Sequence, residues 1–189
     1  MDFQLMHTAR QITTEDVIIE ITAPGGTDYF IDIGGEYKQG NAPFYYKALE
    51  NDFIFRCSVS PEFNTTYDAG CLLAYEREDR WIKFAFENTD LGYPSVVSVV
   101  TNGFSDDCNG ERITDNKIYL QVVRKADNWC LHYAKDKSNW KMVRYFNYAL
   151  NKELKVGISA QSPLGKGCKV RFGDIEIIKN VYNDIRKAL

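Results

Sequence analysis

The chain has 189 residues, of which 44% are hydrophobic and 26% are charged. These proportions are typical of a globular protein with a sizeable core, and they exclude a disordered chain, a collagen and a disulfide-stapled miniprotein. Lysine and arginine total 23 against 26 aspartates and glutamates, which gives a net charge of -3. No global positive field would attract nucleic acid or anionic lipid, so we expect neither nucleic acid nor a membrane among the partners.

Apolar and polar residues alternate with a period of two along most of the chain, which predicts β-strands with one buried face. In chain order, strands are expected at 17–22, 53–59, 69–75, 81–87, 95–101, 118–124, 129–134, 155–160 and 169–178. The clearest is 81–87, where Ile and Phe side chains share one face while Trp81, Lys83, Ala85 and Glu87 share the other. One face of each strand is therefore expected to be apolar.

Turn-forming residues separate these runs, at 24–26, 34–35, 78–80, 102–103, 109–110, 126–128 and 165–167. With this spacing we expect about ten to fourteen short strands in one domain spanning 1–189. So many strands are expected to divide between two stacked sheets, because a sandwich buries both inner faces. The sequence thus predicts an all-β fold, an antiparallel two-sheet β-sandwich. One short C-terminal helix is expected at 181–189, where Val181, Ile185 and Leu189 recur every four residues.

The five cysteines are widely spaced and include no C-x-x-C pair, and the chain has only two histidines, His7 and His132. We therefore expect five free thiols, no metal site and no cofactor. The N-terminus has no apolar run of signal-peptide length, and no apolar stretch is long enough to span a bilayer, so a cytoplasmic location is expected.

Several short segments carry a family resemblance through their order and spacing. They are 27–30, 40–44, 68–70, 81–84 with Glu87, 98–101 with 105–106, 119–125, Tyr133 with Trp140, and 161–163 with 167–168. From 27 to 178 the chain resembles a family of uncharacterised concanavalin A-like sandwiches, a domain-of-unknown-function family that includes a regulator of enolase. The resemblance implies a jelly roll of the lectin/glucanase fold, also similar in its second half to the sandwich appended to some β-xylosidases. It implies no established reaction, because a fold does not fix a function.

Polar residues on one predicted strand face form the best candidate site. Lys83 and Glu87 are roughly 13 Å apart along the strand, and we expect them to bracket a ligand near Thr101, Ser105 and Asp106. Trp81 on the same face would supply an aromatic surface for a sugar ring, while carboxylate and amide oxygens would hold its hydroxyls. The competing interpretation is a solvent-facing strand with charges and one half-buried tryptophan.

Three further residues complete the candidate ligand-binding set. Arg124 is expected either to project into the same concavity or to form a structural ion pair with Glu87 or Asp106. Asp28 and Asn41 are included only through the resemblance, because Asx side chains at strand ends usually cap their own backbone.

Catalysis is a weaker interpretation of the same residues. A glycosidase needs two carboxylates about 5 to 5.5 Å apart for retention or about 6.5 to 9.5 Å for inversion, and Glu87 with Asp106 is the best pair available. We therefore predict a domain that binds a carbohydrate on its concave face without demonstrable catalysis. Two alternatives stay open: a glycoside hydrolase-like enzyme using a Glu/Asp pair, and a regulatory domain that binds a protein partner.

Overall fold

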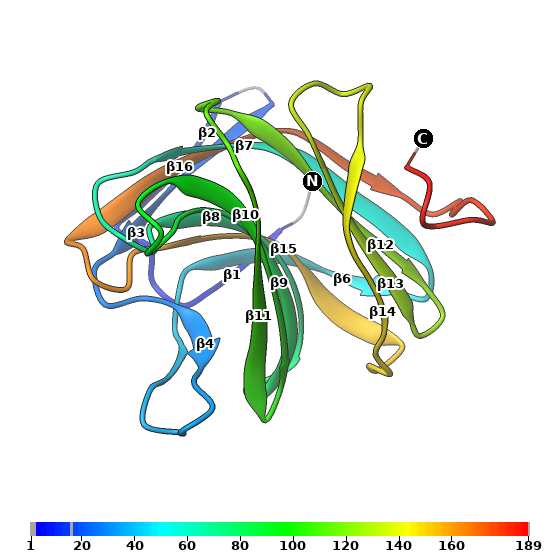
Figure 1. Cartoon of the computed structure of the whole chain (residues 1–189), viewed down its shortest axis with the longest axis horizontal. Helices are drawn as coiled ribbons and strands as arrows, with labels where there is room; N and C mark the ends of the chain where they lie inside the picture. The colour runs from blue at the N-terminus through cyan, green and yellow to red at the C-terminus, as the bar shows by residue number, and fades with distance from the viewer. Residues whose placement is uncertain (1–2, 16, 189) are drawn as a thin grey trace.

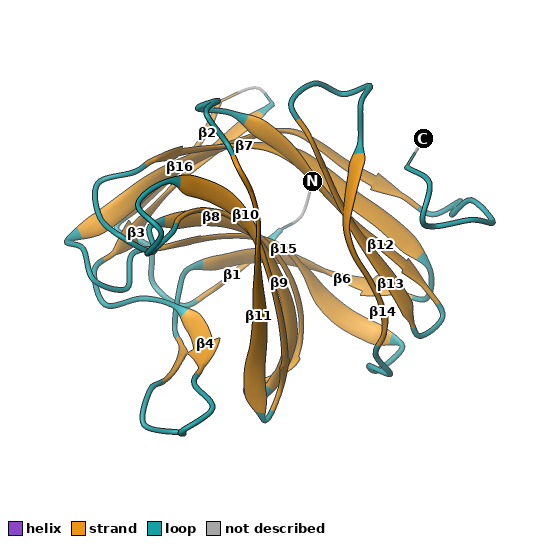
Figure 2. Cartoon of the chain, viewed as in Figure 1, coloured by secondary structure: helices purple, strands orange, loops and turns teal. Residues whose placement is uncertain are grey.

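The computed structural model describes residues 3–15 and 17–188, which form sixteen β-strands and no helix (Figure 1, Figure 2). The strands are β1 (Gln4–Met6), β2 (Gln11–Glu15), β3 (Ile18–Pro24), β4 (Tyr29–Ile31), β5 (Lys38–Gly40), β6 (Phe44–Glu50), β7 (Phe53–Glu62), β8 (Ala69–Arg77), β9 (Arg80–Asn88), β10 (Pro94–Asn102), β11 (Phe104–Arg112), β12 (Ile118–Lys125), β13 (Asn128–Ala134), β14 (Lys141–Asn147), β15 (Glu153–Gln161) and β16 (Gly167–Ile178).

Two seven-stranded antiparallel sheets stack face to face, and β4 and β5 form a separate hairpin (Figure 1). The strand order is β1-β6-β15-β8-β9-β10-β11 in the first sheet and β14-β13-β12-β7-β16-β3-β2 in the second. Neighbours such as β15 and β8 are far apart in the sequence, so the chain crosses repeatedly between the sheets. The predicted antiparallel β-sandwich is confirmed, and every predicted strand overlaps an observed one.

The core lies between the inner faces of the two sheets. Alternation sends every second side chain of a strand inward, and these are aromatic or branched aliphatic residues. The main cluster includes Leu72, Ile82, Phe84 and Phe86 from the first sheet and Phe55, Leu120, Val122 and Phe172 from the second. Burial of each such side chain contributes roughly 1.5–3 kcal/mol. Because this face of β9 holds the sandwich together, Lys83 and Glu87 point to the outer face of the first sheet.

The predicted C-terminal helix is wrong for residues 181–188, and Leu189 lies outside the described residues. The segment is irregular and lies across the outer face of the second sheet, where Ile185 packs with Ile54, Val123 and Cys130. Lys125 Nζ also donates to the carbonyl oxygen of residue 183 at 3.1 Å. A helix this short is marginal by itself, so contacts with the sheet determine the conformation.

The predicted turn at 109–110 is also wrong, because both residues lie inside β11. Asn109 pairs with Val97, and the register shifts between Ser95 and Val97. A Cβ atom on Gly110 would lie 2.6 Å from Val96 Cγ2, so glycine is needed there for close approach of two strands. The glycine therefore accommodates an irregular pairing within the strand.

The described residues hold five free cysteines, of which four are buried and Cys108 is exposed. Within the same part of the chain, no helix has the length and apolar character needed to cross a membrane.

Candidate functional site

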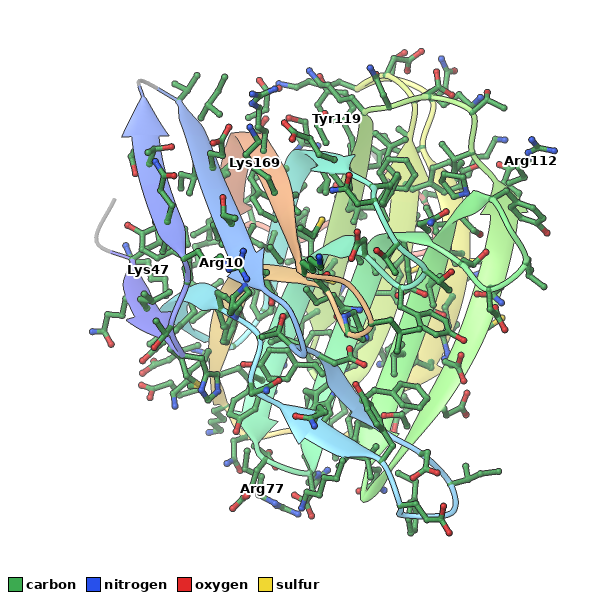
Figure 3. All side chains as sticks on the ribbon, turned by 90° about the vertical axis from the view of Figure 1, so that its left-hand side faces the viewer. Arg10, Lys47, Arg77, Arg112, Tyr119 and Lys169 are labelled. Atoms are coloured by element: carbon green, nitrogen blue, oxygen red, sulfur yellow. The ribbon has the colours of Figure 1, made fainter. Side chains whose placement is uncertain are left out.

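A pocket of about 370 Å³ lies between the outer face of the first sheet and the β4–β5 hairpin. Figure 3 shows this hairpin, in pale blue, crossing in front of the green strands of the sheet. The sheet contributes Lys83 and Glu87 from β9, Val97 and Val99 from β10, and Asp107 and Asn109 from β11. The hairpin and the polypeptide leading into it contribute Asp28, Phe30, Asp32 and Tyr37, and three loops and a strand end supply Tyr67, Asp90, Gln161, Pro163 and Leu164.

The pocket exists because the central strands carry small side chains on their outer face. Ala69, Cys71, Ala85, Val97 and Val99 form a buried cluster there, against which Phe30 of the hairpin packs. Larger residues at these positions would fill the space between sheet and hairpin. The floor of the pocket is therefore apolar, and Lys83 and Glu87 rise from neighbouring positions of β9.

Lys83 is the single cation among the residues that line the pocket, and only 2% of it is exposed. Its Nζ donates to Asp28 Oδ1 at 3.1 Å and to Gln161 Oε1 at 3.2 Å. Burial lowers the pKa of Lys83, but attraction from Asp28 and Glu87 outweighs it, and the net pKa is raised. The side chain is therefore a charged ammonium with its own counter-ion.

Asp28 connects the hairpin to this ammonium. Its Oδ1 also accepts the Tyr29 backbone N–H at 2.7 Å, and its Oδ2 accepts the Tyr37 hydroxyl at 3.2 Å. The backbone N–H of Asp28 donates to Asn41 Oδ1 at 3.0 Å, and Asn41 Nδ2 donates to the Gly26 carbonyl at 3.1 Å. Asp28 is thus a pocket residue, and Asn41 holds the loop that places it.

Glu87 lines the pocket and is 7% exposed, yet its carboxyl group makes no hydrogen bond to any other described residue. Burial raises the pKa of Glu87 to about 8; Lys83 opposes this shift, and Asp28, Asp107 and Asp90 add to it. Near neutral pH the group is therefore largely protonated. A carboxyl group that faces the pocket without a protein partner is able to accept a hydrogen bond from a ligand, or to donate one.

Three aromatic rings, those of Phe30, Tyr37 and Tyr67, stand half-buried around these polar groups. Tyr67 has a backbone φ of 68°, an outlier for a bulky residue. Its N–H donates to the Asn88 carbonyl at 2.7 Å, and its carbonyl accepts Gln161 Nε2 at 3.2 Å. These bonds hold the strained backbone in place, so Tyr67 is fixed at the edge of the pocket.

Trp81 is not available to stack on a sugar, contrary to the sequence prediction. It does share the outer face with Lys83, but the hairpin covers that end of β9 and the indole is fully buried. Tyr29 meets it edge-on at 5.7 Å, and Tyr75 stacks on it at 6.2 Å with an interplanar angle of 8°. Trp81 therefore belongs to the packing that supports the hairpin.

Thr101 and Ser105 also support the hairpin and do not line the pocket. Their hydroxyl oxygens are 2.8 Å apart and buried. Ser105 Oγ accepts the backbone N–H of Ile31, in β4, at 3.0 Å. The pair ties the hairpin to the edge of the first sheet.

Asp106 and Arg124 lie away from the pocket, which corrects both predictions made for them. Asp106 is on the opposite face of β11 and pairs with Arg144 at 3.2 Å. Arg124 is in the second sheet, at the end of the sandwich, where it donates to the carbonyls of residues 126, 150 and 152. Neither forms the predicted ion pair with Glu87, and Glu87 with Asp106 is not a pair across one cleft.

Sequence reasoning missed Tyr37, Tyr67, Asp107 and Gln161. Asp107 could have been found by counting outward from the tight turn after Asn102. Thr101 pairs with Ser105 across this turn, and two residues further along each strand Val99 pairs with Asp107. Val99 also pairs with Lys83, so Asp107 lies on the same face as Lys83. Gln161 sits in register with Ala69, which pairs with Glu87. That contact follows a crossover between distant strands, and no local signal in the sequence announces it.

A second hollow, of about 540 Å³, adjoins the pocket, with Leu164 lining both. Its charged lining residues are all basic: Arg10, Lys166 and Lys169. Figure 3 labels Arg10 and Lys169 on the side of the molecule that carries this hollow. Lys169 Nζ is 3.0 Å from Glu62 Oε1, so part of this charge is already neutralised. The two hollows therefore differ in the sign of their charge.

Comparison with protein families places the chain in a family described as "Protein of unknown function (DUF1349)", whose model matches residues 5–180. The chain belongs to this family of concanavalin A-like sandwiches. Among the curated proteins, none matches the chain significantly.

Solved structures with the same fold include a functionally unknown protein from Saccharomyces cerevisiae, with a TM-score of 0.89, 19% identity, and coverage of 95% of this chain and 97% of that one. A legume lectin-like domain from Entamoeba histolytica has a TM-score of 0.65 at 10% identity, covering 95% and 90%. A xylan β-1,4-xylosidase from Bacillus halodurans has a TM-score of 0.64 at 10% identity, covering 82% of this chain but 32% of the enzyme. At these identities the likeness establishes the fold alone.

Proposed function

We propose that this protein binds a saccharide in the pocket between the first sheet and the β4–β5 hairpin. The observation that carries the proposal is the combination, in one pocket, of half-buried aromatic rings with a buried carboxyl group, Glu87, that has no hydrogen-bond partner among the described residues. The volume of about 370 Å³ falls within the range of roughly 300–1,000 Å³ that is usual for small-molecule sites.

The chemistry of a sugar suits these groups. A pyranose has C–H faces that pack on aromatic rings, such as those of Phe30, Tyr37 and Tyr67, and hydroxyls that donate to carboxylates or amide oxygens. A ligand hydroxyl that reaches Glu87 would give its carboxyl group a hydrogen-bond partner in a site shielded from bulk water. The names of the lectin-like and xylosidase neighbours also favour a saccharide ligand.

The test is a glycan array probed with the purified chain, followed by titration calorimetry on the best ligands. Glu87→Gln and Tyr67→Ala are expected to weaken binding at least roughly tenfold, the first through the changed buried hydrogen-bonding group and the second through lost ring contact. Tyr67→Phe keeps the ring and should bind nearly as well as the wild type. Glu153→Gln, an exposed carboxylate on β15, is the matched control. Failure to bind any glycan, with the fold intact, would refute the proposal.

The proposed function is binding without hydrolysis. If the protein were a glycoside hydrolase, it would release reducing ends from the ligands found on the array, and the release would stop in Glu87→Gln. The sequence-based alternative of a protein partner has no specific support in the pocket and stays a prediction.

A further inference from the structure

The lining of the pocket is strongly acidic. Five of its residues are carboxylic acids and one is an amine. Lys83 is already paired with Asp28 at 3.1 Å, so these two charges neutralise each other. The remaining acids are Glu87 in the interior and Asp32, Asp90 and Asp107 toward the opening. An anionic ligand would meet repulsion from the three aspartates at the opening, and the one lining cation, Lys83, is already paired.

Glu87 gives this arrangement a specific recognition group. Its side chain is more than nine-tenths buried, lines the pocket and makes no hydrogen bond to any other described residue. The other buried polar groups around it, Lys83, Asp28 and Gln161, all have partners. A ligand donor placed against Glu87 would give this carboxyl group the partner that the described residues do not supply.

We propose that the saccharide is a cationic one, an aminosugar whose ammonium group lies between Glu87 and the aspartates at the opening of the pocket. The inference rests on the proposed function and adds the class of sugar. An ammonium is the one common sugar substituent that donates hydrogen bonds and also carries a positive charge, so it answers both the unpaired carboxyl group and the acidic opening.

The aromatic rings support the same assignment. Ammonium groups are attracted to the faces of Phe and Tyr within about 6 Å of the ring centroid. Lys83 Nζ, a primary ammonium of the chain itself, already lies 5.9 Å from the centre of the Phe30 ring in this pocket. The site thus already accommodates one cation of the proposed type, held by a carboxylate and an aromatic ring together.

The experiment is titration calorimetry with three probes: a β-1,4-linked glucosamine trisaccharide, its fully N-acetylated counterpart, and methylammonium. At pH 7 and low salt we expect the glucosamine trisaccharide to bind roughly tenfold or more tightly than the N-acetylated form, the ratio that one partly buried charge pair supplies. The preference should shrink as salt is raised, because screening weakens the attraction of the exposed aspartates.

A pair of variants on one strand tests the location. Asp107→Asn is expected to weaken glucosamine binding by roughly threefold or more, since it removes a carboxylate from the opening. Asp106→Asn makes the same change one residue away on the opposite face of β11 and should leave binding unchanged. Equal losses in the two variants would overturn the proposal, because the effect would then come from overall charge.

The three probes separate failure of this inference from failure of the proposed function. Equal or tighter binding of the N-acetylated trisaccharide overturns the aminosugar assignment and leaves saccharide binding standing. Methylammonium binding as tightly as the trisaccharide overturns both, because the sugar ring would then contribute nothing. Absence of binding by any of the three, with other glycans bound on the array, overturns the aminosugar assignment alone.

Discussion

Lys83 and Glu87 lie four residues apart on the same face of β9, and within the part of the chain that the structure describes the side chain of Lys83 has hydrogen-bonded partners while that of Glu87 has none. The ammonium of Lys83 is held by Asp28 and Gln161, whereas the carboxyl group of Glu87 faces an open pocket. Two ionisable residues on the same face of one strand therefore have different surroundings and different roles. Lys83 stabilises the pocket, and Glu87 is exposed to whatever enters it.

The stability of the protein is expected to fall with rising pH because of Glu87. Burial first, then repulsion from Asp28, Asp107 and Asp90, raises its folded-state pKa from the ordinary 4.5 to about 8, against the attraction of Lys83. The folded state therefore holds the proton more tightly, and its advantage, at most about 5 kcal/mol, is complete below pH 4.5 and is lost as pH rises through 8.

The measurement is urea denaturation of the wild type and Glu87→Gln at pH 5, 7 and 9. The variant should lose less stability over this range than the wild type, and Glu153→Gln should behave like the wild type. Both proteins keep all the other charged or titratable groups that face position 87, so the difference between their pH profiles reports on Glu87. These groups are Lys83, Asp28, Asp90, Asp107, Tyr67 and Cys71. Parallel pH profiles for wild type and Glu87→Gln would contradict the assignment.

Lys83→Met is expected to destabilise the fold by about 3 kcal/mol, because it leaves the buried carboxylate of Asp28 without its counter-ion. Asp28→Asn alone should be similarly harmful. The double variant should lose much less than the sum of the two, since neither charge is then left unpaired. A double-mutant cycle from denaturation midpoints measures this coupling, and additive effects would show that the pair does not interact.

Trp81→Ala is expected to lower stability by about 3–5 kcal/mol, because it empties a buried space between Tyr29 and Tyr75 beneath the hairpin. Trp81→Phe should keep the hairpin in place and preserve glycan binding. Calorimetric binding and thermal melting of the two variants separate the roles. If Trp81→Phe folded normally but lost binding, the indole would have to contact the ligand directly.

Arg124→Lys is expected to destabilise the protein by about 2 kcal/mol without changing ligand affinity. The guanidinium donates hydrogen bonds to three carbonyl groups at the end of the sandwich, and an ammonium cannot reach all three in that geometry. Denaturation and glycan titration of the same sample test the two parts. A large loss of affinity at unchanged stability would show that Arg124 contributes to ligand binding after all.

Much of the fold was predictable because the inner face of central strands such as β9 carries large apolar side chains, which alternate with smaller or polar residues on the outer face. The missed strands either are as short as three residues, as β4 is, or show no clear alternation of apolar and polar residues. In β11, polar residues such as Asp106 and Asp107 occupy both faces, and in β14 both Met142 and Tyr145 are exposed, so neither pattern indicates a buried side. The C-terminal helix was predicted from a spacing of four that in the structure serves packing on the second sheet.

The candidate site was predictable only where one strand sufficed. Lys83 and Glu87 share β9, and alternation alone places them together. Asp106 was predicted on the wrong face because the side of β11 that a residue occupies depends on the register set after Asn102. Arg124 was misplaced because nothing local indicates which of two sheets a strand joins. Burial of Trp81 depends on a hairpin formed some fifty residues earlier in the sequence, a contact that local patterning does not reveal.

The small side chains under the pocket can change without disturbing the core that holds the two sheets together. Strands β8 and β9 hold the sandwich with one face, through residues such as Leu72 and Phe84, and form the pocket floor with the other, through Cys71 and Ala85. A substitution at Ala85 can reshape the floor while the inner face keeps its packing. The outer face is thus free to change while the inner face still encodes the same sandwich, and solved structures with 10–19% identity to this chain share the fold.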